Sequence, residues 1–157
     1  MKKIFPLKDL KFKISRLKRQ KKKIVFTNGC FDIIHNGHVR VLKKAKSFGD
    51  ILVVAINDDR SVRRLKGENR PIFPLRERAG VLASFEYVDY IVSFSQPTPI
   101  KVIKALRPDI LVKGGDYRDK DIVGSLFIKE SGGSVKRVPI YKNYSSSRIL
   151  KEITRLF

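Results

Sequence analysis

Apolar residues follow two spacings along the chain, one typical of helices and one of buried strands. The first helical stretch covers residues 7–19, where the apolar positions are Leu7, Leu10, Ile14 and Leu17. This spacing predicts an amphipathic helix with a basic outer face. Short continuous apolar runs are typical of parallel strands that are covered on both faces. Such runs predict strands at residues 23–27, 51–56, 90–93 and 110–113, with a weaker fifth strand at 134–140.

Helical spacing returns between these runs. It predicts a helix behind the first strand that ends at Gly49, and further helices over residues 75–85, 100–106 and 122–131 and through Ile149, Leu150, Ile153 and Leu156. Thr98 and Pro99 have the form of an N-cap followed by proline at the first helical position. The polar, basic and proline-containing residues 57–74 predict a long functional loop with no more than a helical turn. Because strands and helices alternate, the predicted fold class is α/β, with a mostly parallel five-stranded sheet and flanking helices.

Length and composition indicate one main folded unit. A chain of 157 residues is long enough for one core, so we expect residues 1–22 to form a basic helix and connector and residues 23–157 to form the main domain. No stretch reaches the roughly 18 consecutive apolar residues that a membrane-spanning helix needs. The first residues lack the apolar core of a secretory signal, and a single cysteine excludes an internal disulfide. These features predict a cytoplasmic protein without a membrane partner.

The formal net charge of +20 introduces another class of partner, because dense lysine and arginine attract polyphosphate chains. The run Lys18–Lys23 is strongly basic, and it suits the negative end of a helix as well as a nucleic acid. The basic residues are spread over many segments, and no aromatic-rich nucleic-acid motif accompanies them. We therefore favour small phosphorylated substrates and keep a basic nucleic-acid-binding module as an alternative.

The two histidines of the chain lie three residues apart at a predicted strand-to-helix turn. They belong to the sequence His35-Asn36-Gly37-His38. A helix start offers free backbone N–H groups and a positive dipole end, both of which favour phosphate. Gly37 leaves room for a bulky group, and the two imidazoles add donors that can follow charge onto phosphate oxygens in a transition state. The pattern favours phosphoryl or nucleotidyl transfer by positioning and electrostatics, without a covalent intermediate.

Two other interpretations of this turn stay open. With Cys30 close by, the histidine pair has the spacing of a metal site, but one cysteine and no obvious fourth soft ligand argue against it. A four-residue pattern also occurs by chance, so it needs support from elsewhere in the chain.

Support comes from a serine-rich block that precedes the last predicted helix. The block consists of Ser145, Ser146, Ser147 and Arg148. It gathers hydroxyls, free backbone N–H groups and a guanidinium at a second helix start, which predicts a second anion site. Simple capping is the competing interpretation, although capping needs only one serine.

Further candidates follow the second and fourth predicted strands. After the fourth strand, Lys113 suits a phosphate and Asp116 suits a sugar hydroxyl or the Mg²⁺ that accompanies a nucleotide, while glycines such as Gly115 allow close backbone approach. Basic residues on and after the long loop are Lys66, Arg70 and Arg78. For the first two, solvated surface is the competing interpretation, and for Arg78 it is a surface ion pair.

These motifs resemble the cytidylyltransferase-like nucleotidyltransferases, whose His-x-Gly-His signature and serine-rich helix start match residues 35–38 and 145–148. The likeness covers nearly everything from Lys23 onward. A narrower likeness, to the heptose 1-phosphate adenylyltransferase of bacterial ADP-heptose synthesis, rests on residues 27–35, 64–71 and 111–117. The resemblance implies a Rossmann-like, doubly wound nucleotidyltransferase domain. It would condense ATP with D-glycero-β-D-manno-heptose 1-phosphate and release pyrophosphate and ADP-heptose for lipopolysaccharide core assembly.

The resemblance also implies roles for individual residues. His35, His38 and Lys113 would be catalytic, with the histidines stabilising the transition state at the α-phosphate. The nucleotide would be bound by Thr27, Asn28, Gly29, Cys30, Phe31, Gly37, Gly115, Ser145, Ser146, Ser147 and Arg148. The sugar phosphate would be bound by Asp32, Lys66, Arg70, Arg78 and Asp116.

The implied partners are small molecules. Mg²⁺ would accompany ATP, with no metal held by the protein alone. A separate kinase would make the sugar phosphate, because only a short basic helix precedes the first predicted strand. A homodimer is compatible with the sequence. Within the same class, a cytidylyltransferase for glycerol phosphate or a related polyol phosphate is the main alternative.

Overall fold

The structure, a computed structural model, describes residues 2–115, 118–139, 146–153 and 155. The helices are α1 (Leu7–Arg19), α2 (Asn36–Lys46), α3 (Asp59–Lys66), α4 (Leu75–Ser84), α5 (Ile100–Leu106), α6 (Ser125–Glu130) and α7 (Ser146–Ile153), with a 3₁₀ turn, η1, at Asp119–Asp121. The strands are β1 (Ile24–Gly29), β2 (Ile51–Asn57), β3 (Tyr90–Phe94), β4 (Ile110–Gly114) and β5 (Ser134–Val138). None of the described helices is both long and apolar enough to cross a membrane.

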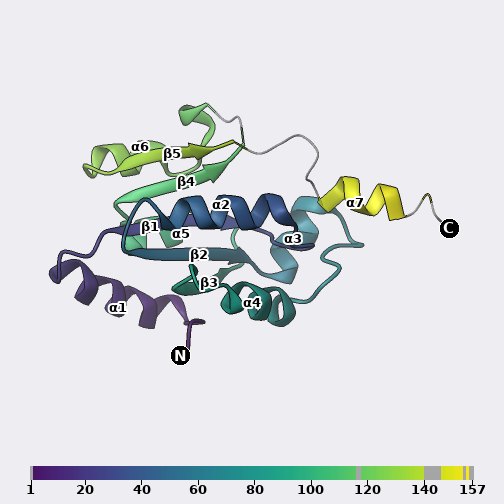
Figure 1. Ribbon diagram of the computed structural model, residues 1–157, viewed down its shortest axis with the longest axis horizontal. Coiled ribbons are helices and arrows are strands. Elements are labelled where there is room, and N and C mark those ends of the chain that lie inside the picture. Colours follow the sequence, from purple (N-terminus) through teal and green to yellow (C-terminus); the bar gives the residue numbers. More distant parts are fainter. Residues whose placement is uncertain (1, 116–117, 140–145, 154, 156–157) are drawn as a thin grey trace.

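All five strands run parallel in one sheet, in the order β3-β2-β1-β4-β5. The chain starts the sheet at its centre with β1, proceeds outward to β3, and then crosses back to β4 on the other side of β1 (Figure 1). A parallel sheet in which the strand order reverses in this way is doubly wound. The predicted Rossmann-like α/β class with five strands is therefore confirmed.

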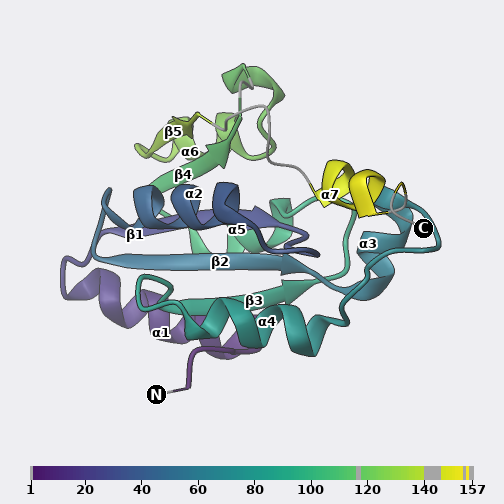
Figure 2. The same cartoon turned by 45° about the vertical axis from the view of Figure 1, so that its right-hand side comes forward.

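Helices cover both faces of the sheet (Figures 1 and 2). One core lies under α2 and α4, where Leu42 and Leu82 are fully buried. The other lies under α1, α5 and α6 and includes Leu10 and Ile103. Successive strand residues point to opposite faces, because the side-chain period of a strand is two. The continuous apolar runs of the sequence therefore supply both cores at once.

β1 and β4 separate toward their carboxyl ends. They pair only at Val25 with Ile110 and at Phe26 with Leu111, whereas β1 stays paired with β2 as far as Gly29. The connection after β1 leads through α2 to β2, and the connection after β4 leads through η1 and α6 to β5 on the other side. A crevice therefore opens between the ends of β1 and β4. In open parallel sheets, ligands bind at this reversal of strand order.

The structure differs from the prediction in the long polar segment and at one helix cap. Residues 57–74 contain the helix α3, where the polar pattern predicts no more than a turn. Asp58 caps this helix by accepting a hydrogen bond from the Ser61 backbone N–H at 2.8 Å. α3 is only eight residues long and has two apolar residues, Val62 and Leu65, which are too few to predict more than a turn. α5 has Pro99 as its N-cap without a side-chain hydrogen bond, so the predicted Thr98 cap is wrong.

The predicted end of the helix behind the first strand is also wrong. α2 ends at Lys46, and Gly49 lies in the turn that follows. Gly49 is required there for a different reason, because an added Cβ would lie 2.8 Å from the Val25 side chain and 2.9 Å from the Lys23 carbonyl oxygen. The last helix is present as α7, and Leu156 of the predicted pattern lies outside the described residues.

Candidate active site

The turn after β1 brings an aromatic ring beneath the histidine pair. Phe31 has a φ of 49°, in the left-handed region that non-glycine residues adopt uncommonly. This conformation places its ring in the core under α2, where only 6% of the residue is exposed. Gly29 permits the arrangement, because an added Cβ would lie 3.1 Å from the Phe31 ring. The local backbone is thus shaped to support the residues that follow.

His35 and His38 lie together at the start of α2. His35 is the N-cap residue, His38 is the third helical residue, and their ring centroids are 3.9 Å apart. The His35 backbone N–H donates to Nδ1 of His38 over 3.4 Å, and the Phe31 ring lies 5.2 Å from the His38 ring. The expected location of both imidazoles at a helix N-terminus is confirmed. Their roles in catalysis stay predictions.

Electrostatics keep these imidazoles neutral. Burial, the neighbouring His35 and the positive charge of Lys66 lower the pKa of His38 to about 4. Burial and Lys66 also lower the pKa of His35. Because Nδ1 of His38 accepts a hydrogen bond, the single proton of its neutral ring lies on Nε2. His38 is therefore a neutral N–H donor near pH 7, and the effect of Lys66 indicates that this lysine lies near the pair.

The lowered pKa of His38 predicts a loss of stability in acid. Between its ordinary pKa of 6.5 and the folded pKa of about 4, the unfolded chain binds a proton that the folded chain does not. The free energy of unfolding therefore falls as the pH falls through this window. We expect the wild type to lose about 2 kcal/mol more than His38→Gln between pH 7 and 4.5. Urea unfolding at both pH values measures this difference, and equal losses in the two proteins would contradict it.

Lys113 and Asn28 line a cavity at the crevice between β1 and β4. The cavity has a volume of about 190 Å³ and is also lined by Pro99 and by residues 121–123. Burial lowers the pKa of Lys113, while the neighbouring Cys30 opposes this shift. A buried ammonium gains most from an anionic partner, since it has lost part of its hydration. The cavity thus offers a cation and an amide to a ligand at the switch point of the sheet.

Cys30 lies in the same turn with an unreactive thiol. Its Sγ is 3.8 Å from Oδ1 of Asn57, and burial raises its pKa above the ordinary value. A protonated thiol binds metal and attacks electrophiles poorly. Among the described residues, no three histidine, cysteine or carboxylate side chains come together as a metal site.

Asp32 and Arg70 form a buried pair that joins the β1 turn to the segment before α4. Asp32 is 2% exposed and Arg70 is 9% exposed, and Nε of Arg70 donates to the Asp32 carboxylate. The other Asp32 oxygen accepts from the backbone N–H of Ile72 at 2.7 Å. Nη2 of Arg70 is buried and has no hydrogen-bond partner among the described residues. Two residues that were each predicted to bind substrate are therefore brought together, and the ion pair occupies only Nε of the Arg70 guanidinium.

Arg78 does not face the cleft, in contrast to the expectation that it meets substrate phosphates. It is 1% exposed, and its guanidinium donates to the backbone oxygens of Cys30, Asn57 and Phe73. A fourth bond, of 2.7 Å, joins it to the Asp59 carboxylate. Arg78 therefore ties the turn after β1, the junction of β2 and α3, and the segment before α4 together at the carboxyl edge of the sheet, and we interpret it as a positioning residue.

Asn57 is a buried polar residue at this edge that the sequence interpretation missed. It is 3% exposed, and its amide donates to the Ser61 hydroxyl at 2.8 Å. Its position directly after the apolar run of β2 was the available signal, because strand ends in a parallel sheet meet at one edge.

The remaining predicted residues are placed only in part. Thr27 is buried and Gly37 is buried in the first turn of α2. Lys66 ends α3, and Gly115 follows β4 with a φ of 108°. α7 lies beside α3 at the carboxyl edge of the sheet, and it begins with Ser146, Ser147 and Arg148 (Figures 1 and 2). Asp116 and Ser145 lie outside the described residues.

A doubly wound parallel sheet that holds neutral imidazole donors and lysines at its switch point defines a nucleotidyltransferase type of α/β domain. Comparison with known proteins agrees, since residues 26–152 match the cytidylyltransferase-like family. The chain belongs to this family.

Curated relatives resemble nearly the whole chain. The bifunctional protein HldE of Helicobacter pylori strain J99 is 51% identical over 98% of this chain and 32% of that protein. HldE of Citrifermentans bemidjiense is 50% identical over 96% of this chain and 31% of that protein. The chain thus spans about a third of the length of these relatives.

Solved structures agree with the fold. A lipopolysaccharide core biosynthesis protein from Thermoplasma volcanium has a TM-score of 0.62 and 31% identity, over 79% of this chain and 99% of that one. Pantoate-beta-alanine ligase from Francisella tularensis has a TM-score of 0.67 over 98% of this chain and 77% of that one. Its 19% identity supports a shared fold alone.

Proposed function

We propose that the chain is a sugar-phosphate adenylyltransferase that joins ATP and D-glycero-β-D-manno-heptose 1-phosphate to give ADP-heptose and pyrophosphate. The observation that carries the proposal is the neutral pair His35 and His38 at the start of α2, beside the crevice between β1 and β4. Helix start, imidazole donors and nearby lysines together form a site for a phosphate in transit.

The reaction is an in-line displacement. An oxygen of the sugar 1-phosphate attacks the α-phosphorus of ATP, and the P–O bond to the β-phosphate breaks with its electron pair leaving on pyrophosphate. Negative charge grows on the α-phosphate oxygens and on the leaving group. Nε2–H of His38 donates to this charge, and the positive end of α2 stabilises it. The imidazole is neutral before ATP binds. It therefore needs no carboxylate counterion, which ATP would otherwise have to displace.

Cations on two sides of the crevice hold the substrates. Lys113 meets the nucleotide from the β4 side, and Lys66 approaches from the end of α3. Arg70 offers its Nη groups to the sugar phosphate, while Asp32 fixes the guanidinium in place through Nε. Orientation by such groups accounts for much of the rate in phosphoryl-type transfer.

Mg²⁺ would enter with ATP and neutralise charge on its phosphates. This ion keeps several waters and needs only one or two protein carboxylates besides the phosphates. The described residues of the cleft fit that mode, because they offer phosphate donors, and the Asp32 and Asp59 carboxylates are engaged by arginines. Asp116 is the candidate carboxylate.

The choice of sugar rests on likeness. Residues 27–35, 64–71 and 111–117 resemble heptose 1-phosphate adenylyltransferases. A structural relative with 31% identity is named as a lipopolysaccharide core biosynthesis protein, and the curated relatives are named HldE. The first of these names accords with a sugar nucleotide of the lipopolysaccharide core.

A pyrophosphate-release assay tests the proposal. We expect release with ATP, Mg²⁺ and the heptose 1-phosphate, and slower release when CTP or GTP replaces ATP or a hexose phosphate replaces the heptose. A preference for CTP with glycerol phosphate would instead select a polyol-phosphate cytidylyltransferase. Absence of release with every sugar and polyol phosphate would refute nucleotidyl transfer.

A further inference from the structure

The outer face of α1 exposes a large aromatic side chain. Phe12 is 72% exposed, although it lies in the middle of a helix whose residues Leu10 and Ile14 are buried in the core. Phe12 projects to the side opposite these two residues, since helix positions two apart point in nearly opposite directions. Its side chain therefore contributes little to the core of the domain.

Basic residues surround this ring. Lys8 precedes Phe12 by four residues, and Arg16 and Arg19 follow it by four and seven, which places all of them on one side of the helix. Lys11 lies at the edge of the same face, and each of these residues is exposed. Asp9, three residues before Phe12, is the one acidic residue of α1, and it lies exposed on the same side of the helix among these basic residues. We call Lys8, Lys11, Phe12, Arg16 and Arg19 the α1 face.

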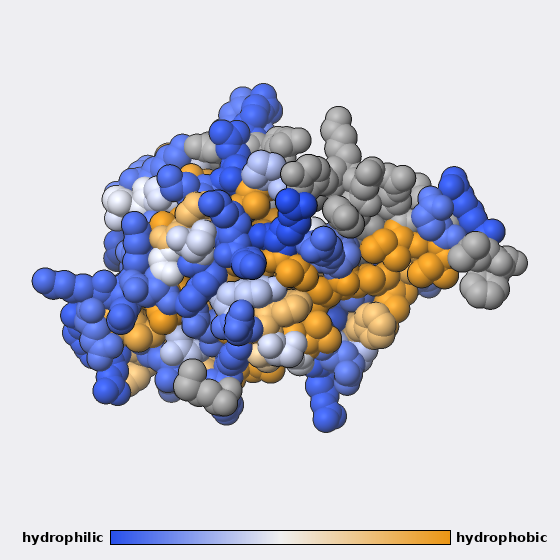
Figure 3. Space-filling view, in the orientation of Figure 1, coloured by the Kyte–Doolittle hydropathy of each residue, from blue (hydrophilic) through white to orange (hydrophobic). Residues whose placement is uncertain are grey.

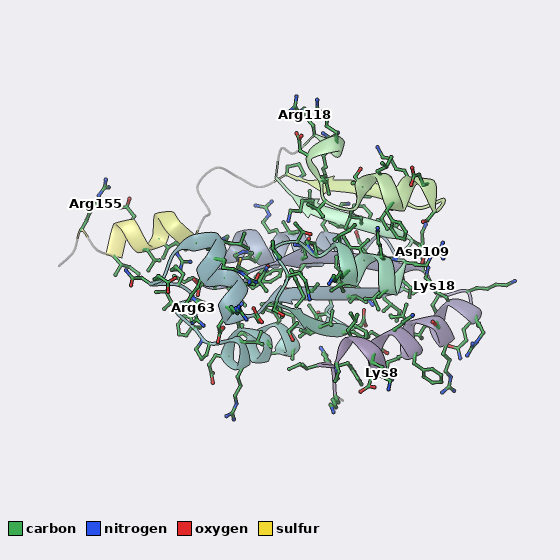
Figure 4. The ribbon with its side chains drawn as sticks, turned by 180° about the vertical axis from the view of Figure 1, so that it is seen from behind. Lys8, Lys18, Arg63, Asp109, Arg118 and Arg155 are labelled. Carbon is green, nitrogen blue, oxygen red and sulfur yellow. The ribbon has the colours of Figure 1, made fainter. Side chains whose placement is uncertain are left out.

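The basic residues of the α1 face differ from the other basic residues of α1. Lys18 donates to the Asp109 carboxylate at 3.2 Å, and the two lie close together in Figure 4. Lys13 lies over the Phe5 ring at 5.2 Å. Within the described part of the chain, by contrast, no acidic group pairs with Lys8, Lys11, Arg16 or Arg19. Figure 4 shows Lys8 on the side of α1 that faces away from the sheet.

The positive surface continues past the end of α1. Lys21, Lys22 and Lys23 are exposed there and line a hollow together with the turn before β5. Hydrophilic residues dominate this end of the molecule in Figure 3. Lysines and arginines attract an anionic surface over about 8–10 Å at physiological salt.

We propose that the α1 face docks the protein on an anionic phospholipid membrane surface, with the Phe12 ring entering the headgroup region. Basic side chains around one exposed aromatic residue are the combination that binds such interfaces without spanning them. The sequence-based expectation of no membrane partner considered only a spanning segment, which this proposal does not require.

The shape of the face favours a bilayer over a nucleic acid. The face is the convex outer side of one helix with a single aromatic ring, whereas single-stranded nucleic acid is bound in grooves that stack several bases. Its position also leaves the cleft open. α1 packs on α5 and β3, and the carboxyl end of β2 points away from it in Figure 1.

Vesicle sedimentation with the whole chain tests the charge component. We expect binding to vesicles of one part phosphatidylglycerol and three parts phosphatidylcholine, and no binding to phosphatidylcholine alone. The double variant Lys8→Glu/Arg19→Glu should bind at least roughly 30-fold more weakly, because each basic residue near an anionic surface contributes about 1 kcal/mol. Lys43→Glu/Lys136→Glu makes the same change in net charge at exposed positions of α2 and β5, and it should weaken binding less than about 3-fold.

A tryptophan reporter tests the orientation. The chain has no tryptophan, so Phe12→Trp gives a single emission signal. Its emission should shift to the blue on addition of the anionic vesicles, whereas Leu126→Trp, at a site that is 71% exposed on α6, should not shift. Pyrophosphate release by the same variants separates this docking from the proposed function, because the α1 face takes no part in that reaction.

Three results would overturn the proposal. They are the absence of binding to anionic vesicles, equal losses in the two charge variants, and a blue shift of Leu126→Trp without one of Phe12→Trp. A blue shift of Phe12→Trp with a DNA or RNA oligonucleotide, but not with vesicles, would assign the face to nucleic acid instead.

Discussion

Replacing His38 by alanine should lower kcat for pyrophosphate release by roughly 100- to 1000-fold, the usual effect of removing one donor from a transition-state site. The structure gives the reason, since His38 is held neutral with its proton on Nε2 at the start of α2. A donor that acts mainly in the transition state changes kcat more than KM. Steady-state rates with ATP and the sugar phosphate measure the effect.

Two further variants make the result specific. His38→Gln keeps an N–H donor on a side chain of different reach, so it should regain part of the lost rate. Lys43→Ala changes an exposed residue of the same helix and should leave the rate unchanged. His38 contacts the Phe31 ring but is only half-buried, and for that reason its replacement should leave the protein folded. An unfolded His38→Ala protein would show that the imidazole serves structure, and a folded protein with full activity would show that it takes no part in catalysis.

The sequence was sufficient to predict the fold and the centre of the site. Continuous apolar runs in β1, β2 and β4 reflect burial on both faces, which only a covered parallel sheet provides. A turn that follows such a strand must lie at the carboxyl edge of the sheet. The location of His35 and His38 followed from their order in the chain, because it needed no knowledge of distant contacts.

Other features of the site could not be predicted, because they depend on loops meeting in space. Asp32 and Arg70 are 38 residues apart, and neither neighbourhood indicates that they pair. The interior position of Arg78 was likewise hidden, since three of its acceptors are backbone oxygens, which every residue carries. Basic residues look alike in sequence whether they meet substrate, solvent or the backbone.

Replacing Arg78 by methionine should lower the free energy of unfolding by about 3 kcal/mol, within the range for breaking a buried ion pair. Methionine keeps much of the side-chain volume but leaves three backbone oxygens and the Asp59 carboxylate without their donor. The Asp59 side chain is 33% exposed, so water recovers part of the loss and the value lies at the low end of that range. Urea unfolding at pH 7 measures the change.

Arg76→Met is the matched control, because Arg76 is exposed on the same helix and its replacement should change stability by less than about 0.5 kcal/mol. Equal stability of the two variants would contradict the role of Arg78. Asp59→Asn, alone and combined with Arg78→Met, isolates the ion pair through a double-mutant cycle. Since Arg78 joins the β1 turn to the start of α3, the helix that ends at Lys66, and to the segment that carries Arg70, Arg78→Met should also raise KM for the sugar phosphate. That rise distinguishes a residue that positions the site from one that only stabilises the fold.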